Sequence, residues 1–275
     1  MDISIEENLI LNEVRQIRKL HKRMGTRKLY DKLQSFMLDH QVKMGRDTLF
    51  NLLSANNLLV RKRKRRVQTT QSFHWLRKYP NLIKDFIPTA PNQLWVSDIT
   101  YWKIKNGFVY ITLITDAYSH KIVGYHVAAS LESIETVQSL KMALLSLNKE
   151  LENHFQLIHH SDRGIQYCSH KYVKLLKDNN IKISMTESGD PLENAIAERI
   201  NGILKEEYLQ DYSPKNVTEA RKILDKIVKL YNEDRPHNSI GNFFPEQVHQ
   251  LNLKTEKLWK NYYKKRCTIV NSIQD

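Results

Sequence analysis

The chain has 275 residues, 41% of them hydrophobic, and a formal net charge of +13, so it is long enough for one large domain or two smaller ones. Its 2 cysteines exclude a disulfide framework, and no apolar stretch approaches the roughly 18 residues that a membrane helix needs. The acidic start is unlike a signal peptide, so we expect a soluble, cytoplasmic protein without a membrane partner.

The first 90 residues carry most of the net positive charge, which favours a polyanion as the partner of this part. Apolar residues at three- and four-residue steps predict helices over 9–22 and 27–36, with Thr26 as a cap, and a third helix from residue 45. Three short helices with basic residues outside predict a small all-α, helix-turn-helix-like DNA-binding domain over residues 1–60. A helical bundle with no role in DNA binding is the alternative.

An unbroken run of six cations follows this helical region: Arg61, Lys62, Arg63, Lys64, Arg65 and Arg66. Like charges repel, so these side chains are not expected in a core. We predict a basic linker over residues 61–91 whose cations lie along DNA phosphates, against the alternative of a plain solvated tether. Prolines make residues 67–91 irregular in this reading.

From residue 92 the pattern changes from helical to strand-like. Strands are predicted at 93–103, 108–114, 122–127, 156–160 and 181–185, and helices at 133–148, 169–179, 191–209 and 217–232. Asn106-Gly107 predicts a hairpin between the first two strands, whereas strands reached through helices should be parallel. The expected fold is α/β, with a five-stranded mixed sheet and flanking helices in a ribonuclease H-like layout over 92–250, followed by a tail at 251–275.

Two aspartates stand out in this core. Asp98 interrupts an apolar strand, where an aspartate is disfavoured unless a partner compensates its burial. Asp162 directly follows the strand at 156–160, at the carboxyl end where open α/β sheets place their sites. Taken singly, Asp98 could equally be a hydrogen-bonded core residue, and Asp162 a turn residue.

The third carboxylate, Glu198, shares a helix face with Asn194, Asn201 and Lys205, opposite a row of isoleucines. Three carboxylates in separate elements can hold two divalent cations for phosphoryl transfer on nucleic acid. We therefore predict that Asp98, Asp162 and Glu198 are catalytic and bind metal, and that Lys205 contacts DNA. A solvated helix face is the alternative for Glu198 and Lys205.

Other polar residues receive structural interpretations. Asp116 fits turn chemistry, and Glu132 and Glu135 fit capping at the start of a helix, although a ribonuclease H would use a helix glutamate near that place. His159 and His160 end a strand, where ordinary polar residues are favoured over a late ligand or proton carrier.

Residues 95–101, 160–167 and 193–198, which contain the three carboxylates, resemble the DDE transposases of bacterial insertion sequences. They resemble most closely the second-open-reading-frame products, which are similar to retroviral integrases in their catalytic core, and residues 231–238 resemble that family's C-terminal signature. The resemblance implies a catalytic triad of Asp98, Asp162 and Glu198 with Mg²⁺ or Mn²⁺, and a DNA-binding Lys205.

The same resemblance implies cleavage at insertion-sequence ends by water, then attack of the exposed 3′-hydroxyl on a target phosphodiester. The implied partners are double-stranded DNA, as terminal inverted repeats and as target, and further copies of the chain, with the upstream-frame product as a candidate. Two other classes stay open: a DNA-binding regulator with an inactive core, and a ribonuclease H-type nuclease that uses Glu132 or Glu135.

Overall fold

The computed structural model describes residues 3–60, 74–147, 156–187 and 191–256. The predicted cations at 61–66 and all but the start of the predicted tail lie outside these residues. Within the described ranges, no helix is both long and apolar enough to cross a membrane.

Three helices form the amino-terminal part: α1 (Ile3–Leu20), α2 (Thr26–Asp39) and α3 (Arg46–Ala55). Leu29, Leu33 and Leu53 are fully buried in a small core that these helices form among themselves. The helix start at Ile3 is earlier than predicted, because Glu6, Glu7 and Asn8 interrupt the apolar period near its beginning. The predicted cap at Thr26 is wrong, since Gly25 occupies the N-cap position.

The larger part is built on five strands: β1 (Leu94–Ile104), β2 (Gly107–Asp116), β3 (Ile122–Ala128), β4 (Ile158–Ser161) and β5 (Lys182–Met185). Their order in the sheet is β3-β2-β1-β4-β5. β2 pairs antiparallel with β1 and β3, whereas β4 is parallel to both β1 and β5. The predicted hairpin is confirmed, with Gly107 at φ 109° directly after the turn.

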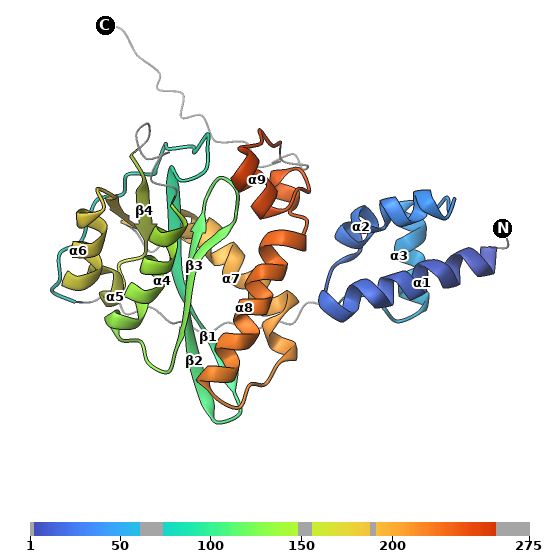
Figure 1. The fold of residues 1–275 in the computed structure, drawn as a ribbon, viewed down its shortest axis with the longest axis horizontal. Coiled ribbons are helices and arrows are strands. Elements are labelled where there is room, and N and C mark those ends of the chain that lie inside the picture. The colour runs from blue at the N-terminus through green and yellow to red at the C-terminus, as the bar shows by residue number, and fades with distance from the viewer. Residues whose placement is uncertain (1–2, 61–73, 148–155, 188–190, 257–275) are drawn as a thin grey trace, which may run out of the picture.

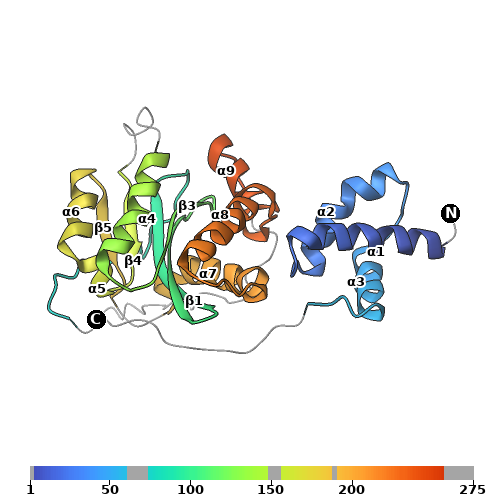
Figure 2. The same ribbon diagram turned by 60° about the horizontal axis from the view of Figure 1, so that its bottom comes forward.

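Helices cover both faces of this sheet (Figures 1 and 2). One face holds α4 (Ser133–Ser146), α5 (Ile165–Cys168) and α6 (His170–Asp178), and the other holds α7 (Ala195–Glu207) and α8 (Val217–Asp234). The predicted helix at 191–209 is divided into η2 (Pro191–Asn194), α7 and η3 (Leu209–Asp211). The carboxy-terminal helix α9 (Pro245–Leu251), which packs against α8, was not predicted.

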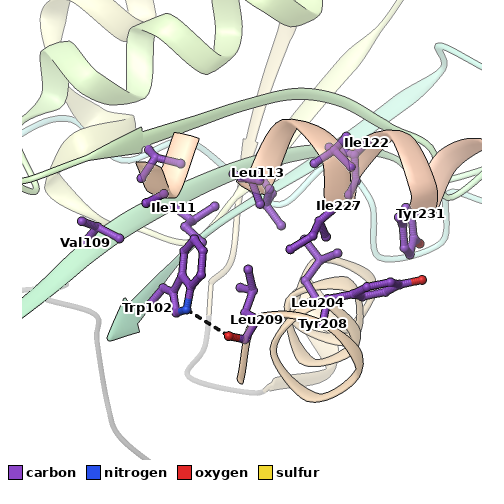
Figure 3. Packing of buried hydrophobic residues seen from close by; sticks show 14 of the residues in the cluster. Trp102, Val109, Ile111, Leu113, Ile122, Leu204, Tyr208, Leu209, Ile227 and Tyr231 are labelled. Carbon is purple, nitrogen blue, oxygen red and sulfur yellow. Dashed lines mark hydrogen bonds between the residues drawn. The ribbon is translucent and has the colours of Figure 1, made fainter. Parts of the chain in front are cut away.

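The core between the sheet and α7–α8 is continuous, as Figure 3 shows. Trp102 lies there among Ile111, Leu204 and Tyr208, and its Nε1 donates a hydrogen bond to the carbonyl oxygen of Leu209 at 3.1 Å. Burial of these aromatic and branched side chains contributes most of the free energy that holds α7 against the sheet. Since α7 also carries Glu198, this core positions part of the candidate site.

An irregular segment lies along the open edge of the sheet, beside β5. In this strap, defined as residues 74–84, the Pro80 carbonyl oxygen accepts from the Met185 amide at 3.3 Å, and the Leu82 amide donates to Ser184 Oγ at 2.9 Å. The first bond occupies a backbone amide that an edge strand would otherwise expose, and the second attaches the strap to a side chain of β5. The linker was predicted to be irregular, but its packing on the edge was not.

The helical part docks on the ends of α7 and α8 through charged side chains. His21 lies 2.9 Å from the Tyr208 hydroxyl and donates from Nε2 to Asp234 at 2.7 Å. Lys28 pairs with Glu207 at 2.7 Å, and buried Arg235 holds the same carboxylate through two bonds of 2.8 Å. Residues 234 and 235 of the C-terminal signature therefore help to join the two parts.

The helix α4 packs closely against β3 at Gly124. A Cβ at this position would lie 2.2 Å from the carbonyl oxygen of Ser139 and 2.8 Å from Ala143 Cβ. We expect Gly124→Ala to lower the free energy of unfolding by about 1 to 3 kcal/mol, since backbone cannot yield cheaply. The matched control is Gly202→Ala in α7, where a Cβ meets nothing within 4 Å and should stabilise by about 0.4 to 1 kcal/mol. Urea unfolding measures both, and equal behaviour would contradict the close approach.

Candidate active site

The pairing of β1 and β4 places two aspartates side by side. Val96 is opposite His160 in this parallel pair, and continuing the register by two residues sets Asp98 opposite Asp162. Neighbouring strands are about 4.8 Å apart, and equivalent residues of parallel strands face the same side. Asp98 faces α7, where Asn201 contacts it, and the charge of Asp162, one residue beyond the end of β4, acts on Asp98.

Each aspartate is held by backbone amides. Asp98 Oδ1 accepts from the Ile99 amide at 2.8 Å, and Asp162 Oδ1 accepts from the Gly164 amide at 2.9 Å. A Cβ at Gly164 would lie only 2.9 Å from the same Asp162 oxygen, so a larger residue would displace the carboxylate. The turn role considered for Asp162 is real, and it orients the side chain at the end of β4.

Two asparagines fix the helix that carries Glu198. Asn194 Nδ2 donates to the carbonyl oxygen of Ser97 at 3.1 Å, and Asn201 Nδ2 donates to Asp98 Oδ2 at 2.7 Å. Glu198 lies between them on the same helix face, one turn from each. The bonds on both sides hold this stretch of α7 against β1, so Glu198 stands beside the aspartates.

The sequence predicted this helix face but not its contacts. Asn194 is 7% exposed and Asn201 is 5% exposed, so the face is not solvated at the asparagines, whereas Glu198 itself is exposed. The position of Asn201, three residues after the predicted catalytic Glu198, was the available signal in the sequence. Its partner Asp98 could not be predicted, because the two residues are 103 positions apart.

The negative charges of the three carboxylates act on one another. Burial raises the pKa of Asp98 to about 7, and the charges of Asp162 and Glu198 add to the rise while hydrogen bonds from Asn201 and Ile99 oppose it. The pKa of Glu198 is also raised, by burial and then by the charge of Asp162. The three residues therefore share one electrostatic environment with excess negative charge.

Lys205 extends the same face of α7 toward the end of the helix. Its ammonium group lies 4.0 Å from the centre of the Tyr101 ring, a cation–π contact to β1. Burial lowers the pKa of Lys205, and the charge of Asp98 opposes that change. The lysine is thus within electrostatic reach of the carboxylates, and Tyr101, which the sequence did not single out, positions it.

The described residues contain no group of three or more His, Cys, Asp or Glu side chains arranged so that it could hold a metal ion. The donor chemistry can still be tested. Carboxylate oxygens are the ligands that Mg²⁺ and Mn²⁺ prefer, and the raised pKa of Asp98 reports a charge that a cation would neutralise. The donor set fits a divalent cation, although the three side chains do not form a closed cage.

Comparisons with known proteins identify the family of this core. Residues 88–191 and 179–245 match two family models, each described as an integrase core domain. A 31 kDa protein of insertion element IS600 from Shigella sonnei, described as uncharacterized, is 36% identical over 82% of this chain and 83% of its own length. The transposase of insertion sequence element IS629 from Shigella sonnei is 32% identical over 83% of this chain and 74% of its length.

The chain belongs to the insertion-sequence transposases with an integrase core domain. The family predicted from the sequence motifs is confirmed. A simian T-cell lymphotropic virus intasome in complex with PP2A regulatory subunit B56 gamma contains a similar chain, with a TM-score of 0.50 and 17% identity over 91% of this chain and 78% of that one. The predicted ribonuclease H-like fold is confirmed.

The remaining polar residues of the transposase core have structural partners. Buried His159 lies 2.9 Å from the Tyr172 hydroxyl, and His160 lies 2.8 Å from Ser184 Oγ. Burial lowers the pKa of His159 to about 3 and that of His160 to about 4, so both are neutral at pH 7. Asp116 is buried at a turn, where Oδ1 accepts from the Ser119 amide at 2.8 Å, as turn chemistry predicts.

The predicted capping role of Glu132 and Glu135 is only partly right. Glu132 is the N-cap of α4, but its side chain makes no capping hydrogen bond. Glu135 in the first turn accepts from His126 Nε2 at 2.8 Å.

Asp98→Asn is expected to stabilise the metal-free transposase by about 1 to 2 kcal/mol above pH 7, because it removes a buried charge that Asp162 also repels. The native pKa is about 7, whereas an unfolded aspartate titrates near about 4. The folded state therefore holds the proton more tightly, and wild-type stability should fall as pH rises between these values and then level off. Thermal melts in EDTA across this range measure the effect.

Added Mg²⁺ should then raise the melting temperature of the wild type and leave that of the Asp98→Asn variant nearly unchanged. Asp178→Asn is the control, since Asp178 lies in an exposed pair with Lys174 on α6. An equal Mg²⁺ response in the two variants would contradict metal binding at Asp98.

Proposed function

We propose that this transposase cleaves DNA at the ends of an insertion sequence and joins the exposed 3′-hydroxyl to target DNA. Asp98, Asp162 and Glu198 are its catalytic carboxylates in this proposal. The arrangement that carries it is the register of Asp98 with Asp162, together with the two asparagines that hold Glu198 beside them. The polynucleotidyl transfer expected of the family supports the same reaction.

The three carboxylates would hold Mg²⁺ or Mn²⁺, which would supply Lewis acid stabilisation of the attacking and leaving oxygens. The amide of Gly164 orients Asp162, and Asn201 orients Asp98. Lys205, supported by Tyr101, would bind a phosphate near the scissile bond. The core of α7 keeps these groups in fixed relative positions.

The proposed partners are double-stranded DNA at the terminal inverted repeats and at the target, with further copies of the chain, since recombination joins two ends. The helical part (1–60) and the predicted cations at 61–66 would supply most of the phosphate contacts. The upstream-frame product is a candidate partner. The family match does not favour the DNA-binding regulator with an inactive core. The ribonuclease H-type nuclease would use Glu132 or Glu135, and Glu135 already accepts a hydrogen bond from His126.

The test uses purified protein and labelled duplex DNA carrying the ends of the element that encodes it. We expect nicks with free 3′-hydroxyls, and joined products, in Mg²⁺ or Mn²⁺ and neither in EDTA. Internal DNA of the same length without the ends is the control. Nicking that persists in EDTA, or that ignores the ends, would overturn the proposal.

A further inference from the structure

The strap attaches to the segment that follows Asp162, and an exposed tryptophan comes directly after the point of attachment. His74 Nε2 donates to the carbonyl oxygen of Arg163 at 2.7 Å, and Arg163 directly follows Asp162 in the chain. Trp75 follows His74 and is 86% exposed. A tryptophan with so much of its surface in water contributes little to the stability of the fold, because its apolar area remains hydrated.

The strap does not depend on Trp75 for its position. Leu76 and Tyr79 pack against the core cluster under α5 and α6. Pro80 and Leu82 form the hydrogen bonds to β5, and Lys84 pairs with Glu187. The segment around Trp75 is therefore a supported surface, on which the indole is presented outward rather than used for packing.

Cations flank the indole. Arg77 and Lys78 are exposed, and the Arg77 guanidinium lies 5.2 Å from the centre of the Tyr79 ring. Burial and Asp162 raise the pKa of Cys168, while Lys78 and Arg163 oppose the rise, so all three charges act on the same thiol. The strap therefore adds the positive charge of Lys78 to the same region as Asp162.

We propose that Trp75 is a stacking platform for an unpaired base of the DNA strand that lies at the carboxylates, with Arg77 and Lys78 binding its phosphates. An aromatic face beside cations is the recognition chemistry of single-stranded nucleic acid, because every base offers a π-face and every nucleotide a charge. The inference rests on the proposed function, since it takes DNA to enter beside Asp162. It assigns the strap a ligand: a few unpaired nucleotides at the cleaved or joined end.

The test measures binding in EDTA, so that no cleavage interferes. The probes are a single-stranded oligothymidylate and a blunt duplex of the same length, each followed by fluorescence anisotropy. Trp75→Ala should weaken single-strand binding by about 5- to 150-fold and leave duplex binding unchanged, whereas Trp75→Phe should retain most of the affinity. The matched control is Leu145→Ala on α4, which removes an apolar side chain that is 87% exposed.

Two further outcomes would overturn the inference. One is wild-type single-strand affinity in Trp75→Ala, or an equal loss in Leu145→Ala. The other is loss of self-association in Trp75→Ala, seen by sedimentation, with unchanged affinity for DNA, which would make Trp75 a contact between copies. Binding is measured in EDTA without cleavage, whereas the catalytic assignment is tested by nicking in Mg²⁺, so failure of the strap and failure of the catalytic assignment are distinguishable.

Discussion

Glu198→Gln should lower metal-dependent cleavage and strand transfer by about 10³-fold or more, the range seen when a group central to transition-state stabilisation is lost. Glutamine keeps the shape of the side chain but removes the charge that a divalent cation needs. The fold should survive, because Glu198 is exposed and the asparagines on either side of it keep their bonds to β1. Gel assays on end-containing DNA in Mg²⁺ measure the effect.

The matched control for this variant is Glu206→Gln, which removes an exposed carboxylate two turns further along the same helix. Its cleavage rate should stay within about twofold of wild type, since surface substitutions away from special features change little. Activity of Glu198→Gln that equals that of Glu206→Gln would refute the catalytic assignment.

Glu207→Gln is expected to lower the free energy of unfolding by about 3 to 5 kcal/mol, because it leaves a buried guanidinium without its counter-charge. Arg235 is 1% exposed and holds Glu207 by two bonds of 2.8 Å. Burial alone would raise the pKa of Glu207, but the bonds and charges of Arg235 and Lys28 lower it to about 2. Urea unfolding at neutral pH measures the loss.

The lowered pKa also fixes the pH window. An unfolded glutamate titrates near about 4.3, so the stabilisation from Glu207 is complete above that value and is lost as pH falls toward about 2. Glu207→Gln should lack this part of the acid dependence. The control Glu233→Gln removes an exposed partner of Lys229 on α8 and should cost less than about 0.5 kcal/mol. Similar losses in both variants would contradict the buried pair.

Local patterns were sufficient to predict the strands and the three carboxylates. β1 and β2 are apolar along most of their length because helices cover both faces of the sheet, and an aspartate amid such neighbours, Asp98, needs a reason to be there. The Asn106-Gly107 dipeptide likewise carries its own turn geometry. These signals are contained within a few consecutive residues, so they can be read without knowing the fold.

Features that depend on distant partners were missed. The bond from Asn201 to Asp98 joins residues 103 positions apart, and the strap acquires its role only where β5 offers a free edge. The helix α5 has 4 residues, too few to show a helical period. His21 and Lys28 read as surface cations in sequence, although they bind Asp234 and Glu207.

The helix α7 connects the candidate site with the contact to the helical part. α7 bears Glu198 in its first turn and closes at Glu207, where Lys28 of the helical part is attached. Its 13 residues make a rod roughly 20 Å long. A tilt of the amino-terminal helices would move the Glu207 end of α7, and the rigid helix would transmit this movement to Glu198 at its other end. The proposed DNA binding by the helical part would then be mechanically coupled to the proposed cleavage at the carboxylates.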